Sequence, residues 1–113
     1  MELNLNTVQR PTLNLTMMNE EQTVLRVKVP TLNQFKEVQA LYSKLDGVED
    51  GDKDSEDALY EVLARLLSCN RDHIKVTADE LKKDGKYHLD LEDAILVFRA
   101  YVDFIASIAN AKN

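Results

Sequence analysis

The chain has 113 residues, a formal net charge of −6 and a single cysteine. This length is typical of one domain that can bury a real core. The acidic balance argues against binding to nucleic acid or to an anionic membrane surface, because both attract basic patches. A single cysteine allows no internal disulfide, and the start, MELNLNTVQR, lacks the pattern of a secretory signal, so we expect a cytoplasmic protein.

The first thirty residues predict β-structure. Apolar and polar side chains alternate in Thr12–Met17 and again in Thr23–Val29, which is the period of a half-buried strand. We therefore expect a hairpin. Two strands alone are barely stable in water, so this hairpin must lie on the helices or join the sheet of another chain. Met1–Arg10 is interpreted either as a loose arm or as a third strand that pairs between subunits.

Pro30 ends the second strand, and a helix is predicted to follow. Thr31 and Gln34 have the spacing of a capping box, in which each side chain reaches the backbone N–H of the other residue. Gly47 is the predicted stop. The apolar side chains of this helix recur at three- and four-residue steps and are Leu32, Phe35, Val38, Leu41, Tyr42 and Leu45.

Two further helices are predicted before the last one. The first is expected to begin at Asp54 or Ser55 and to end near residues 69–70. The second is short, opens with a capping box formed by Thr77 and Glu80, and is expected to close at Gly85.

The last helix, from Asp90 to about Asn110, is the longest. Its polar side chains cover only about a quarter of the circumference, whereas a helix packed on one side of a domain needs an apolar stripe of only about 100°. The helix is therefore either the buried centre of the domain or meets another chain on one side. Arg99 and Asp103 form an i,i+4 pair on its polar stripe, either as a surface pair or as part of an interface. The predicted partner-binding residues are Val97, Tyr101, Phe104, Ile105 and Ile108.

Together these elements predict an α+β fold that is mostly helical. An N-terminal β-hairpin or arm, residues 1–30, is followed by a helical domain of about four helices, residues 31–113, and the two are expected to form one compact unit.

The acidic segment Asp46–Asp57 has two interpretations. Asp50, Asp52, Asp54 and Glu61 fall at positions 1, 3, 5 and 12 of a calcium loop. Position 6, however, is Ser55 where the turn of such a loop calls for glycine. The alternative, a solvated and mobile acidic loop, is the interpretation that we favour.

Catalytic and metal-binding patterns are weak. Cys69 and His73 are four residues apart, which would suit a thiolate–imidazole pair or half of a metal site, but no further ligand is near in sequence and His88 is the only other histidine. A buried thiol beside a surface histidine is the favoured interpretation. We expect no catalytic residue, no metal, no cofactor and no enzymatic activity.

A set of stretches from Thr23 onward carries a family resemblance. They are Leu25, Val27, Val29 and Pro30-Thr31; Asp57-Ala58-Leu59 through Leu66-Leu67-Ser68 and Asn70; Val76-Thr77-x-x-Glu80-Leu81; and Tyr101-Val102-Asp103-Phe104-Ile105 running to Ala111-Lys112-Asn113. In this order they resemble the tail-assembly chaperones of siphophages, most closely those of phages that infect lactococci.

The resemblance implies a non-enzymatic protein that binds and solubilises the tape measure protein, a very long and largely helical chain that sets tail length. It also implies a homo-oligomer in the host cytoplasm that leaves as tube subunits polymerise. No functional residue of the family is carried over. The residues themselves leave an alternative open: a small acidic regulatory or inhibitory protein that occludes a basic partner surface through Asp46–Asp57.

Overall fold

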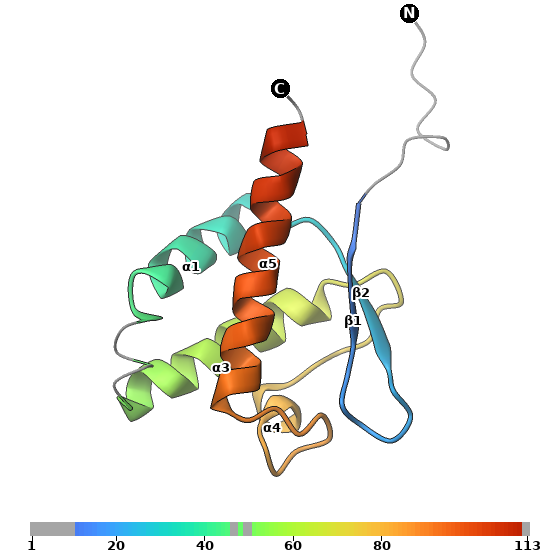
Figure 1. Cartoon of the computed structure of the whole chain (residues 1–113), viewed down its shortest axis with the longest axis vertical. Helices are drawn as coiled ribbons and strands as arrows, with labels where there is room; N and C mark the ends of the chain where they lie inside the picture. Colours follow the sequence, from blue (N-terminus) through green and yellow to red (C-terminus); the bar gives the residue numbers. More distant parts are fainter. Residues whose placement is uncertain (1–10, 46–47, 49–50, 112–113) are drawn as a thin grey trace, which may run out of the picture.

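The computed structural model describes residues 11–45, 48 and 51–111, with side chains as far as residue 108. Its elements are the strands β1 (Leu13–Thr16) and β2 (Val24–Val27) and the helices α1 (Leu32–Tyr42), α3 (Lys53–Ser68), α4 (Ala78–Leu81) and α5 (Leu91–Ala111) (Figure 1). The predicted α+β architecture, a hairpin followed by helices of which the last is long, is confirmed. The predicted arm Met1–Arg10 and the predicted stop Gly47 lie outside the described residues.

The hairpin is antiparallel and places one apolar face on the helices. Leu13 lies opposite Val27, and Leu15 lies opposite Leu25. Leu25 and Val27 are fully buried, as the alternation of apolar and polar residues predicts. The connecting turn is held by the buried Asn19, whose Oδ1 accepts from the backbone N–H of Thr23 at 3.0 Å.

Helix α3 is the element that most of the others contact. It packs against α1, α4, α5 and β2, and α5 crosses it at a steep angle (Figure 1). Its buried side chains lie on more than one face, because it has neighbours on several sides. They are Leu59, Tyr60, Val62, Leu63, Ala64, Leu66 and Leu67.

The turn that follows α3 is built around the side chain of Asn70, which is 1% exposed. Its Nδ2 donates to the carbonyl oxygens of Leu67 and Ile74, both at 2.8 Å. Its Oδ1 accepts from the backbone N–H of Asp72 at 3.1 Å and of Ile74 at 3.0 Å. These bonds use both donors and both acceptor sites of the carboxamide, so a buried polar group is fully satisfied.

The same turn anchors the hairpin. The backbone N–H of Lys28 donates to the carbonyl of Cys69 at 2.8 Å, and that of Arg71 donates to the carbonyl of Arg26 at 2.9 Å. The side chain of Arg26 adds a two-pronged ion pair with Asp72. Residues 69–71 thus extend the sheet beyond β2, and the hairpin gains the support that two isolated strands lack.

Both predicted capping boxes are present. In the first, the backbone N–H of Thr31 donates to Gln34 Oε1 at 3.0 Å and that of Gln34 donates to Thr31 Oγ1 at 3.2 Å. Helix α1 nevertheless ends at Tyr42, before the predicted stop.

The second capping box begins α4 at Thr77 and Glu80, with the backbone N–H of Thr77 donating to Glu80 Oε1 at 3.0 Å. The prediction that this helix closes at Gly85 is wrong. It ends at Leu81, because Lys82 takes an extended conformation with ψ of 163°. A Cβ at Gly85 would overlap the carbonyl oxygen of Asp79, so this glycine permits a close approach of two backbones.

Helix α5 begins as predicted. The backbone N–H of Asp93 donates to Asp90 Oδ1 at 2.8 Å, so Asp90 caps the helix. The segment before it is tied to α3, because the hydroxyl of Tyr60 donates to the carbonyl of Leu89 at 3.0 Å. Among the described residues, no helix has the length and apolar character to cross a bilayer.

We predict that Asn70→Ala destabilises the fold by about 2–3 kcal/mol, because several buried backbone groups lose their partner at once. Urea denaturation measures this change. The control is Asn14→Ala, which removes an exposed amide and should change the free energy of unfolding by less than about 0.5 kcal/mol. Equal effects of the two substitutions would contradict the role assigned to Asn70.

We also predict that the Arg26–Asp72 pair makes stability depend on acid pH. The hydrogen bond from Arg26 lowers the pKa of Asp72 below its ordinary value of 3.8. The stabilisation is therefore present above pH 3.8 and is lost as pH falls through the lowered pKa. Asp72→Asn should lower the denaturation midpoint at neutral pH, and the difference from the unmodified chain should shrink in acid. A difference that stays constant with pH would speak against this account.

Candidate binding groove between α1 and α5

One apolar stripe of α5 runs from the core out to the surface. Ala94, Phe98, Tyr101, Ile105 and Ile108 follow one another at steps of four and three residues, so they share one face of the helix. The first three are at most 1% exposed. Ile105 and Ile108 are only half-buried. The apolar stripe is therefore buried along the first part of the helix and reaches the protein surface toward the C-terminal end.

Helix α1 has two apolar faces rather than one. Val38 and Leu41 are buried in the core. Leu32, Phe35 and Tyr42 point elsewhere and are 71%, 36% and 59% exposed. The exposed set recurs over almost the whole helix, so α1 presents a second stripe that the other described elements cover only in part.

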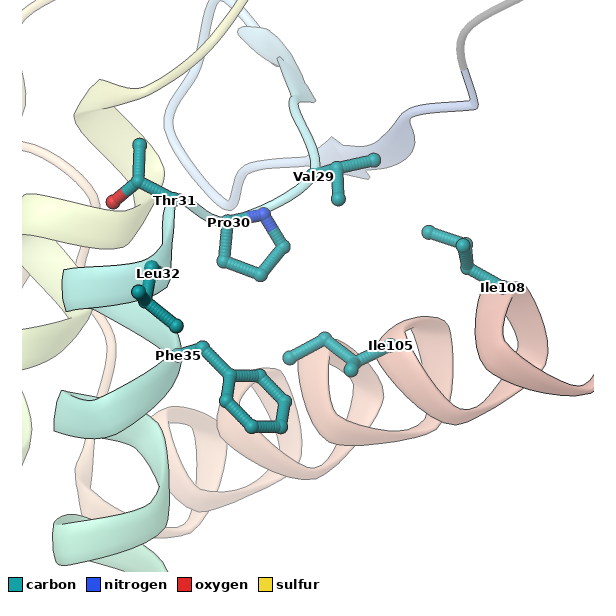
Figure 2. Close-up of a pocket in the computed structure, with 7 residues that line it drawn as sticks. All are labelled: Val29, Pro30, Thr31, Leu32, Phe35, Ile105 and Ile108. Atoms are coloured by element: carbon teal, nitrogen blue, oxygen red, sulfur yellow. The ribbon is translucent and has the colours of Figure 1, made fainter.

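The second stripe of α1 and the end of the stripe of α5 face each other across a groove, here called the α1–α5 groove. It consists of two adjoining pockets of about 290 and 470 Å³, which share Phe35 and Ile105. Figure 2 shows these two side chains pointing toward one another, with Val29 and Ile108 beside the open side. The lining residues are Val29, Pro30, Thr31, Leu32, Phe35, Val38, Gln39, Tyr42, Val102, Ile105, Ala106 and Ile108.

The chemistry of the groove is apolar. Among the residues that the structure describes, its lining has no acidic or basic side chain and no histidine. The hydroxyl of Thr31 is engaged in the capping box of α1 and points away from the opening (Figure 2). The groove can therefore bind by burial of apolar surface, and it holds no group that could act as a nucleophile with a neighbouring base.

The predicted partner-binding residues of α5 fall into three environments. Ile105 and Ile108 line the groove. Val97 and Phe104 are half-buried and do not line it. Tyr101 is a core residue at 1% exposure, and burial raises the pKa of its phenol. A partner cannot reach the side chain of Tyr101 without opening the core.

The sequence pattern does not mark Leu32, Phe35 and Tyr42 as surface residues. Their spacing is compatible with one apolar face that also holds Val38 and Leu41. A signal for the second face exists, since Leu32, Phe35 and Tyr42 are spaced by three and seven residues. In a short helix, the spacing of apolar residues alone does not separate a buried face from an exposed one. Only the packing of α3 against Val38 and Leu41 distinguishes the two faces of α1.

The remaining candidate groups do not gather into a site. Asp54 and Glu61 both lie on α3, where seven residues correspond to about 10 Å along the axis, so they cannot share a calcium loop. Asp52 is the N-cap of that helix and accepts from the hydroxyl of Ser55 at 2.7 Å, while Asp50 lies outside the described residues. The part of the chain that the structure describes has no group of three or more potential metal ligands.

Cys69 and His73 do not share a helix face, because α3 ends near residues 69–70 as predicted. The expectation of a buried thiol is wrong, since Cys69 is half-buried. Cys69 is the C-cap of α3, so the helix ends between the two residues. His73 is exposed and lies in the turn with a φ of 57°. Arg99 and Asp103 are exposed on α5 and do not line the groove.

Comparison with known proteins adds no relative. The chain matches no protein-family model, no curated protein and no solved structure.

We predict that Tyr101→Ala and Leu32→Ala differ sharply in their effect on stability. The first empties a fully enclosed site and should cost about 3–5 kcal/mol, as for other buried aromatic side chains. The second truncates a side chain that is 71% exposed and should change the free energy of unfolding by less than about 1 kcal/mol. Chemical denaturation of both variants checks this, and a large loss for Leu32→Ala would place that residue in the core.

Proposed function

We propose that this chain is a non-enzymatic chaperone of phage tail assembly. In this proposal it binds and solubilises the tape measure protein of a siphophage in the host cytoplasm, acts as a homo-oligomer, and holds a helical segment of that partner in the α1–α5 groove. The observation that carries the proposal is the pair of apolar helix faces on either side of the groove. The resemblance of the sequence to tail-assembly chaperones supplies the partner.

A helix is the occupant that fits the groove best. Both walls are helical, and their apolar side chains recur at three- and four-residue steps, the pattern by which helices pack on one another. From Leu32 to Tyr42 the wall formed by α1 is about 15 Å long, which corresponds to about three turns of helix. An amphipathic segment of that length would complete a three-helix arrangement.

The balance of apolar groove and acidic surface suits a chaperone. Burying Leu32, Phe35 and Tyr42 would contribute about 1–2 kcal/mol each, since part of each side chain is already covered. A binding free energy of this size is sufficient to keep the apolar face of a helix covered and is weak enough for tube subunits to displace the chain. The net charge of −6, located outside the groove, would keep the complex soluble.

We expect co-expression with the candidate tape measure protein to yield a soluble complex, and Leu32→Glu with Tyr42→Glu to abolish it. Two charges would then be buried without partners in an apolar groove. Affinity co-purification followed by mass measurement of the soluble fraction gives the readout. Circular dichroism checks that the double variant stays folded, which its exposed positions favour.

The matched control is Leu96→Glu. Leu96 is an apolar residue of α5 that is 63% exposed but lies outside the groove, so this variant should retain the complex. Loss of the complex in the control, or its retention in the groove variant, would refute the groove as the binding site.

The salt dependence of the complex distinguishes the proposed function from the alternative. A complex in which an acidic protein occludes a basic surface should dissociate steeply as the salt concentration rises, whereas a complex held by apolar contacts should not.

A further inference from the structure

The outer edge of β1 carries backbone groups without a partner among the described residues. Arg26 of β2 and Lys28, which follows the strand, direct their backbone hydrogen bonds to residues 69–71. Because these directions alternate along a strand, Leu25 and Val27 bond to Leu15 and Leu13 of β1. The backbone N–H and C=O groups of Asn14 and Thr16 therefore point away from β2, along the free edge.

This edge carries no charge that would oppose the pairing of strands. The stretch Pro11–Met18 has no charged side chain, although charged residues make up 30% of the whole chain. Strand β1 contains no lysine and no proline, and its ladder with β2 is regular, without a bulge. The described sheet has the two strands β1 and β2, so no other described strand pairs with the outer edge of β1, and the side chains of Asn14 and Thr16 beside it are exposed.

We propose that the edge of β1 pairs with the β1 edge of a second copy of this chain, antiparallel about a twofold axis at Leu15. In this register Asn14 lies opposite Thr16 of the other copy, and the two copies exchange main-chain hydrogen bonds at both positions. The occupant is a second copy because the edge is self-complementary. A chain with a charge of −6 meets its own copy most easily along an uncharged segment.

The pairing also completes the inner face of the sheet. Leu13 and Leu15 pack against the core yet remain half-buried. Across the twofold axis Leu15 would meet its own counterpart, and Leu13 would meet Met17 of the other copy, so both leucines would lose further contact with water. The continuous sheet would have four strands, which overcomes the weakness of a lone hairpin.

This inference specifies the homo-oligomer of the proposed function, but it does not require the tape measure protein. The residues that line the α1–α5 groove belong to the segment 29–42 and to α5, and none of them belongs to β1. The two proposals can therefore fail separately: oligomer mass tests the edge on the chain alone, and co-purification tests the groove.

The test is a pair of variants whose charges sit on the exposed side chains of the edge. In Asn14→Glu with Thr16→Glu, each glutamate faces a glutamate of the other copy, and the apparent dissociation constant of the dimer should rise roughly tenfold or more. In Asn14→Glu with Thr16→Lys, each glutamate faces a lysine, and the dimer should be restored. Light scattering coupled to size exclusion, over a concentration series of the full chain, measures the mass.

The expected result is twice the chain mass of 12.9 kDa for the unmodified protein and for the Glu–Lys variant, and the mass of one chain for the Glu–Glu variant. The inference is overturned if the unmodified chain has the mass of one copy at every concentration. It is also overturned if the Glu–Glu variant dimerises as well as the unmodified chain, or if the Glu–Lys variant does not recover.

Discussion

The hydrogen bonds of Asn70 are the constraint on which the rest of the structure depends. They close the turn after α3, and that turn presents the backbone groups of residues 69–71 to β2. Ser68 reinforces the turn, because its hydroxyl accepts from the backbone N–H of Val76 at 2.9 Å and donates to the carbonyl of Ala64 at 2.7 Å. Satisfied polar groups in a buried turn fix one geometry, because each alternative leaves a group unpaired.

The position of this turn determines where the groove lies. Once β2 is fixed on residues 69–71, the chain leaves it at Val29 and Pro30, and both line the groove. Helix α1 must then begin beside the C-terminal half of α5, as Figure 1 shows. One wall of the groove is thus positioned by the hairpin, and the other by the packing of α5 on α3.

Local patterns predicted most of the fold. The hairpin, both capping boxes and the N-cap Asp90 depend on residues close together in sequence, and all are present. The groove depends on where α3 stops covering its neighbours, which is a property of packing. The sequence shows that α5 has a wide apolar surface. It does not show that the side chain of Tyr101 is buried whereas that of Ile105 is half-buried. The end of α4 at Leu81 was missed for a similar reason, because close approach of two backbone segments, and not the glycine alone, shapes that loop.

The uneven burial of the helices has a consequence for how the groove behaves over time. Only two of the eleven residues of α1 are buried, against seven of the sixteen of α3. Amide protons of α1 should therefore exchange with solvent well before those of α3, since local opening is cheapest where few contacts are lost. The wall of the groove that α1 forms is therefore compliant. Such a cleft can adjust its width to side chains of different size. Under the proposed function, this would let identical copies hold successive segments of one long helical chain.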